Sequence, residues 1–149
     1  MAMKEMSEQE CREVLRRARI GRLGCAFDNR PYVVPISIAC EENYIYSFST
    51  AGQKIKWMRA NPRVCVQTDE ISEQARWVSV IANGEYQELC EPQFEIERAH
   101  ARKLLESQHR WWLNALAERQ MRVGDELVAP LFFRIRIESL SGLQSMDEG

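Results

Sequence analysis

The chain has few of the residues on which metal centres and disulfide frameworks depend: two histidines and five cysteines in 149 residues, with no CxxC pair. The odd number and wide spacing of the cysteines argue against a disulfide framework and against a zinc site. Neither histidine lies near a cysteine in the sequence, so a catalytic thiol is a poor candidate. Such cysteine usage is typical of the reducing cytoplasm. The cysteines are Cys11, Cys25, Cys40, Cys65 and Cys90.

An excess of charge and a long apolar run are also missing. The formal net charge is -2, with acidic and basic residues mixed along the chain, which gives no basic surface for nucleic acid. No run of about eighteen uncharged apolar residues occurs, and the N-terminal MAMKEMSEQE lacks the apolar core of a signal peptide. We therefore expect a soluble cytoplasmic protein that does not contact a membrane.

The length of 149 residues suits a single domain covering the whole chain. Ser7 and Glu10 form a capping-box pattern that predicts a short helix ending before Gly21. A basic helix over Gln53–Ala60 and a long helix from Pro92 to about Arg119 follow, and residues 121–130 are expected to be a loop. Six strands are predicted: Leu23–Phe27, Tyr32–Cys40, Tyr44–Phe48, Arg63–Thr68, Ala75–Tyr86 and Leu131–Leu140.

Six strands joined mostly by tight turns, with only a few helices, predict a mainly β protein with flanking helices, built on an antiparallel barrel. Pro35 lies in the middle of its strand, where it removes a hydrogen-bond donor, so we expect an edge position or a bulge. Such an exposed stretch of backbone could bond to a flat polar ligand. Gly84 is expected to mark a bend or bulge in the fifth strand.

The densest group of binding features runs from Ile45 to Cys65. A strand leads into the small polar turn Ser49–Gly52 and then into a helix that carries Lys54 and Lys56. Hydroxyls, free N–H groups at a helix start and lysines suit an anion. In the simpler interpretation Ser49 and Thr50 only cap the helix and the lysines lie in water, and the spacing alone favours it.

Four stretches, taken in order, resemble the pyridoxamine-phosphate-oxidase-like superfamily of FMN-binding split barrels, and in particular its small group that includes the nitroimidazole-resistance proteins. The resemblance covers nearly the whole chain in the order and spacing of the family. The stretches are RPYVVPISI (Arg30 to Ile38), IYSFSTAGQKIKWMRANPRVCV (Ile45 to Val66), WVSVIANGEY (Trp77 to Tyr86) and FFRIRIESLSG (Phe132 to Gly142).

The resemblance implies a homodimer of six-stranded split barrels with FMN bound in clefts at the dimer interface. It favours the anion-binding interpretation of the turn, with Ser49, Thr50, Gln53 and Lys54 contacting the phosphate. The ring system would lie along the second strand, against the backbone of Tyr32, Val33, Val34, Pro35 and Ile36. Trp77 and Ser79 would complete the cleft, from across the interface.

The activity implied is that of a flavin-dependent oxidoreductase, which takes hydride from NADH or NADPH and reduces a small planar substrate. The flavin carries the hydride, so the protein supplies position and electrostatics, and no catalytic acid or base is evident. The chain ends in LSGLQSMDEG where true pyridoxamine-phosphate oxidases have an arginine- and tryptophan-bearing motif. It has Phe48 where nitroimidazole-resistance proteins commonly have a histidine.

Two alternatives stay open. The protein could be a flavin-binding or flavin-sensing module without turnover, since no motif for gripping a substrate is recognised. The same barrel could hold haem or a deazaflavin; haem would need an axial ligand, for which only His100 and His109 are available.

Trp111 and Trp112 form the last group of interest. Neighbouring helical residues diverge by about 100°, so both indoles cannot face one core. We expect one of them to pack in the core and the other to meet the partner subunit or cover the flavin cleft.

Overall fold

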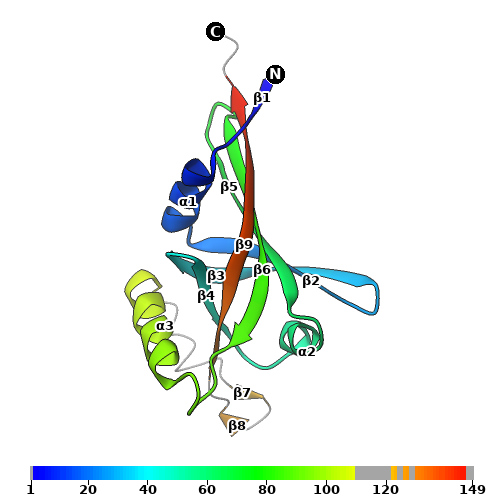
Figure 1. The fold of residues 1–149 in the computed structure, drawn as a ribbon, viewed down its shortest axis with the longest axis vertical. Coiled ribbons are helices and arrows are strands. Elements are labelled where there is room, and N and C mark those ends of the chain that lie inside the picture. The colour runs from blue at the N-terminus through cyan, green and yellow to red at the C-terminus, as the bar shows by residue number, and fades with distance from the viewer. Residues whose placement is uncertain (1, 110–121, 124–125, 128–129, 147–149) are drawn as a thin grey trace.

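The computed structural model describes residues 2–109, 122–123, 126–127 and 130–146. Figure 1 shows long, strongly bent strands with helices packed around them. The helices are α1 (Glu8–Arg17), α2 (Gln53–Ala60) and α3 (Glu95–Gln108). The strands are β1 (Ala2–Glu5), β2 (Ile20–Phe27), β3 (Arg30–Glu41), β4 (Tyr44–Ser49), β5 (Arg63–Ile71), β6 (Trp77–Glu88), β7 (Arg122–Val123), β8 (Glu126–Leu127) and β9 (Leu131–Met146).

Six antiparallel strands form a closed ring. Their order is β9-β4-β3-β2-β5-β6, and β6 pairs again with β9, with Val80 opposite Gly142. Closure hides the edges that an open sheet would expose. The barrel expected from the sequence is therefore confirmed. Separately, no helix in the described part of the chain is long and apolar enough to cross a membrane.

The structure differs from the sequence prediction by three additional strands and by the ends of several elements. β7 and β8 pair within residues 121–130, where a loop was expected. β1 was not predicted; it pairs with the far end of β9, with Ala2 opposite Met146. β5 and β9 extend to Ile71 and Met146, beyond their predicted ends. The helix predicted from Pro92 begins at Glu95 and ends at Gln108 with His109 as its C-cap, so the continuous helix predicted to about Arg119 is interrupted at His109. The predicted stretch up to Arg119, with Trp111 and Trp112, lies outside the described residues.

Two local predictions are confirmed. Ser7 and Glu10 form a reciprocal capping box, in which each backbone N–H donates to the other side chain, at 3.0 and 3.1 Å. The β6–β9 register shifts between Asn83 and Gly84, which is the bulge expected at Gly84. A side chain at Gly84 would meet the backbone carbonyl of Arg136, so the close approach of the two strands requires glycine there.

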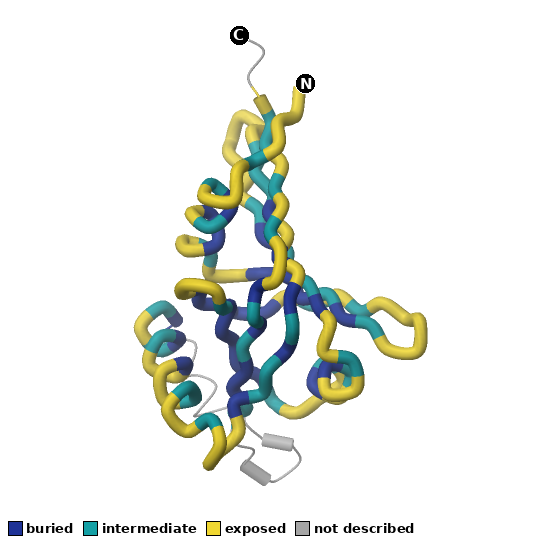
Figure 2. Tube along the Cα trace, viewed as in Figure 1, coloured by how far each residue is buried: buried dark blue, intermediate teal, exposed yellow. Residues whose placement is uncertain are grey.

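The core consists of two clusters. The larger one fills the ring and includes Leu23, Ile38, Val66 and Ile135, all fully buried. The smaller one lies under α3 and joins Leu105 to aromatic residues of β4 and β9. Figure 2 shows burial concentrated in the middle of the ring, whereas the tip of the β2–β3 hairpin and the end near both termini are exposed.

Cysteines contribute to the core as small apolar residues. Cys11, Cys25 and Cys40 are buried and carry free thiols. Burial raises the pKa of the Cys40 thiol to about 12, so this thiol stays protonated at neutral pH.

Candidate functional site

The start of α2 has no side-chain cap. Its N-cap residue is Gly52, and the first helical bond runs from the Lys56 N–H to the Gly52 carbonyl at 3.1 Å. Ser49, which is buried, donates its hydroxyl to the Thr50 carbonyl at 2.8 Å. The interpretation that Ser49 and Thr50 cap the helix is therefore wrong. The amide groups before Lys56 have no acceptor within the helix, so they are oriented to bind an anion from outside.

Space and charge at this helix start also suit an anion. A Cβ built on Gly52 would meet nothing within 4 Å. Lys54 is half-buried beside β2, and burial lowers the pKa of its ammonium group. Among the described residues, no carboxylate forms an ion pair with Lys54. A half-buried cation of this kind is stabilised by an incoming anion.

β3 and β4 separate at the place where this helix start lies. Their pairing ends with Ile38 opposite Ser47, and the Ser47 hydroxyl donates to the Ser37 carbonyl at 2.7 Å. If the same register continued, Ser49 would lie opposite Ile36. Instead, β3 from Arg30 to Ser37 pairs with β2 alone, so its other edge meets no strand among the described residues. This is the split in the barrel.

Pro35 lies on that free edge, which confirms the expectation of an edge position. Ile38 donates its N–H to the Arg19 carbonyl at 2.9 Å, and backbone groups in a strand alternate in direction. Tyr32, Val34 and Ile36 therefore direct their backbone groups toward β2. Five residues were predicted to contact the ring system through their backbone. Of these, Val33 and Pro35 direct their backbone groups toward the free edge.

Ser79 lies on the outer face of the sheet, three strands from Pro35. The register places Ile81, Gln67, Arg22 and Pro35 in one row across β6, β5, β2 and β3. Gln67 donates to the Ser79 hydroxyl at 3.1 Å, and Arg22 donates to the Gln67 side-chain oxygen at 3.2 Å. At a strand spacing of about 4.8 Å, β6 and β3 are about 14 Å apart. The polar network joins β6, β5 and β2 and does not reach β3.

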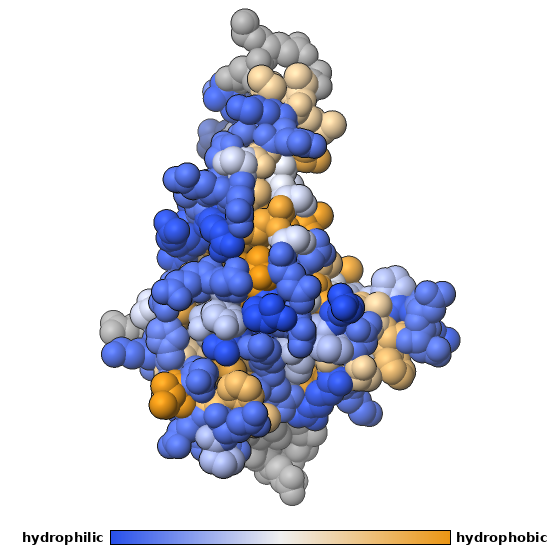
Figure 3. Space-filling model, in the orientation of Figure 1, coloured by the Kyte–Doolittle hydropathy of each residue, from blue (hydrophilic) through white to orange (hydrophobic). Residues whose placement is uncertain are grey.

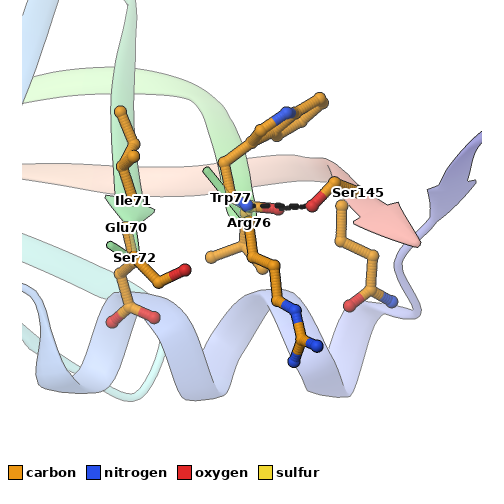
Figure 4. Close-up of a pocket in the computed structure, with 8 residues that line it drawn as sticks. Glu70, Ile71, Ser72, Arg76, Trp77 and Ser145 are labelled. Atoms are coloured by element: carbon orange, nitrogen blue, oxygen red, sulfur yellow. Dashed lines mark hydrogen bonds between the residues drawn. The ribbon is translucent and has the colours of Figure 1, made fainter. Parts of the chain in front are cut away.

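Trp77 lies still farther from α2. It pairs with Ile71 at one end of β5, whereas α2 precedes Arg63 at the other end, about 26 Å away at 3.3 Å per residue. Trp77 borders a pocket of about 430 Å³, and Figure 4 shows its indole pointing away from the side chains of Glu70 and Arg76. A single chain thus brings the turn and the free edge of β3 together. It does not bring Trp77 or Ser79 close to them.

Comparisons with known proteins agree with this architecture. A family model described as pyridoxamine 5'-phosphate oxidase matches residues 7–144. The chain belongs to the pyridoxamine 5'-phosphate oxidase-like family. An uncharacterized protein of Rhizobium meliloti (strain 1021) is 38% identical over 143 residues, which is 95% of each chain.

Two solved structures extend the comparison. A FAD-binding protein from Mesorhizobium loti is 40% identical, with 98% of this chain and 100% of that chain covered and a TM-score of 0.80. The pyridoxamine 5'-phosphate oxidase-like family therefore includes flavin-binding proteins. A candidate 5-nitroimidazole antibiotic resistance protein from Bacteroides thetaiotaomicron is 20% identical, with 97% and 89% covered and a TM-score of 0.71, which shows the fold alone.

Two features of this family member were missed from the sequence. One is a groove of about 550 Å³ along α2. The other is the contact of the Trp57 ring with Phe27 and Tyr32, whose ring centroids lie 6.0 and 5.7 Å from that of Trp57. The regular spacing of Gln53, Lys56 and Arg59 on the helix was the available signal for the groove. The ring contacts join the β2–β3 hairpin to α2 and had no local signal.

Proposed function

We propose that the chain binds a flavin nucleotide in the split between β3 and β4. The uncapped start of α2 and the Lys54 ammonium group bind the phosphate, and the ring system lies along the free edge at Val33 and Pro35. The observation that carries the proposal is the position of a half-buried, unpaired lysine at an open helix start, next to an open strand edge. FMN and FAD both carry the phosphate and the ring system that this site would bind. The sequence analysis favours FMN.

The site is completed by a second copy of the chain. Exposed apolar residues lie on the outer face of the sheet, and Ile20, Val33 and Ile81 are 53%, 67% and 40% exposed. Figure 3 shows hydrophobic side chains gathered over β6 and β9. A partner packed on this face would cover these residues and bring its own Trp77 and Ser79 toward the cleft.

The activity we propose is that of a flavin-dependent oxidoreductase, with a nicotinamide donor and a small planar acceptor. A bound flavin supplies hydride transfer. The residues of this chain orient it: Lys54 fixes the phosphate, the free edge of β3 fixes the ring plane, and the partner subunit excludes water. Packing of Phe48, 6% exposed, against Phe132 directs that side chain into the core under α3. It therefore gives no support to a reaction that needs a polar group at position 48.

The first test is the absorption spectrum of the freshly purified protein, with any released ligand identified by mass. A flavin at about one per subunit is the expected result. NADH or NADPH should then reduce this flavin, and an acceptor should reoxidise it faster than oxygen alone. A protein that binds flavin but shows no such turnover is a binding module, whereas one that binds no added FMN or FAD contradicts the cofactor assignment.

A further inference from the structure

The exposed face of α2 forms a groove that continues from the proposed phosphate site. The groove is lined by Ala51, Gly52, Gln53, Ile55, Lys56, Trp57 and Arg59, and has a volume of about 550 Å³. Its first three residues belong to the turn and helix start that face the flavin phosphate. From Gly52 to Arg59 the helix rises about 10 Å, enough for a nucleotide laid along it.

The charges along this groove suit a second phosphate. Gln53, Lys56 and Arg59 recur at three-residue spacing on one exposed face of the helix. Among the described residues, no carboxylate pairs with Lys56. Arg59, which lines the groove, is paired with the Glu88 carboxylate by two bonds, at 2.7 and 3.0 Å, so each neutralises the charge of the other. The groove therefore carries one unpaired positive charge and no unpaired negative charge from these residues.

An aromatic surface adjoins these charges. Trp57 lines the groove and contacts Phe27, whose side chain is left 46% exposed at the end of β2. Trp57 also makes an edge-to-face contact with Tyr32, which packs against the core. Partly exposed rings held in place by other rings provide a surface on which a nucleobase can stack.

We infer that this groove holds the AMP half of FAD, so that the protein prefers FAD to FMN. The AMP phosphate lies against Gln53 and Lys56, and the adenine stacks on the Trp57 and Phe27 surface. This inference rests on the proposed function, because it extends the same ligand beyond its first phosphate. It departs from the sequence expectation of FMN, and apart from Gln53 it uses residues outside the phosphate site itself.

The test compares the affinities of FMN and FAD for the flavin-free protein, measured by quenching of flavin fluorescence. Wild type should bind FAD at least tenfold more tightly than FMN. Lys56→Glu should lower the affinity for FAD at least fivefold and leave that for FMN within twofold. Lys103→Glu, the same charge change on the exposed face of α3, is the matched control and should alter neither.

The outcomes separate the two proposals. Equal affinities for FMN and FAD, or an equal loss of both in Lys56→Glu, would overturn the AMP site and leave the flavin site standing. A protein that binds neither flavin would overturn both proposals.

Discussion

Arg59 and Glu88 form an ion pair with two bonds, from Nε to Oε1 at 2.7 Å and from Nη2 to Oε2 at 3.0 Å. The pair fixes the last turn of α2 to the end of β6. Glu88 also accepts hydrogen bonds from the Tyr86 hydroxyl at 2.7 Å and the Cys90 thiol at 3.0 Å. The helix is thus fastened at its C-terminal end, which holds its uncapped N-terminal end in place.

Replacing the carboxylate should loosen α2. We expect Glu88→Ala to lower the free energy of unfolding by about 2 kcal/mol, because four donor groups on three residues lose their acceptor and Tyr86 is buried. Glu106→Ala, which breaks the exposed Arg102–Glu106 pair within α3, should cost about 0.5 kcal/mol or less. Urea unfolding measures both, and equal losses would show that the Arg59–Glu88 pair does not anchor the helix.

The same carboxylate should make the protein sensitive to acid. Hydrogen bonds from Arg59, Tyr86 and Cys90 hold the pKa of Glu88 at about 2. A pKa depressed on folding gives stability that is present above the unfolded pKa, about 4.3, and is lost as the pH falls toward 2. In unfolding experiments from pH 6 to pH 2, the free energy of unfolding of wild type should fall toward that of Glu88→Gln across this window. A difference that does not change with pH would contradict the assignment.

Two glycines should lose very different amounts of stability on the same substitution. Gly84→Ala places a methyl group against the Arg136 carbonyl in the middle of the β6–β9 ladder, and should cost about 3 kcal/mol of stability. Gly52→Ala has open space around it and should cost less than about 1 kcal/mol. Thermal unfolding measures the pair. Similar losses in both would mean that the bulge at Gly84 can relax.

The affinity for flavin should fall at alkaline pH because of Lys54. Burial lowers the pKa of this ammonium group, and only its charged form attracts the phosphate. With FMN as the ligand, affinity should therefore be full below the lowered pKa of Lys54 and decline as the pH rises through it, starting from pH 7, where the phosphate monoester of FMN is already mostly a dianion. Lys54→Gln should bind at least tenfold more weakly at pH 7, with little further change up to pH 10. An alkaline decline that persists in Lys54→Gln would assign it to another group.

Disrupting the outer face should separate the proposed dimer. Ile81→Asp introduces a charge on this face and should shift the mass measured by light scattering toward that of one chain, 17.4 kDa. Ile96→Asp, on α3, is the control, because Ile96 is 82% exposed and lies away from that face. A dimer that tolerates Ile81→Asp but not Ile96→Asp would move the interface to α3.

Features set by neighbouring residues could be predicted from the sequence. The Ser7–Glu10 box, the bulge at Gly84 and the edge position of Pro35 follow from backbone chemistry that these residues carry anywhere. The closed ring was expected from six strands joined mostly by tight turns, and the resemblance to a known family agreed with it. The strand at Ala2–Glu5 could not be predicted, because four residues, two of them charged, become a strand only through the partner that β9 offers.

The candidate site was predictable only in part, for a related reason. The turn and α2 adjoin each other in the chain, so their proximity follows from the sequence. The distance of Trp77 and Ser79 from α2 depends on the register of β5 against β6, which no local signal fixes. The absence of a cap from Ser49 likewise depends on where its hydroxyl finds an acceptor, and it finds the Thr50 carbonyl.

β9 pairs with β4, β6 and β1, whose residues lie far from it along the chain. Ring closure must therefore wait for contacts between segments such as Val78–Asn83 and Ser139–Gln144. Contacts of such long range slow folding, because the entropy of closing a long loop is lost before the pairing is gained. Until β9 docks, the edges of β4 and β6 stay unpaired, and an incompletely folded chain could pair through them with another copy.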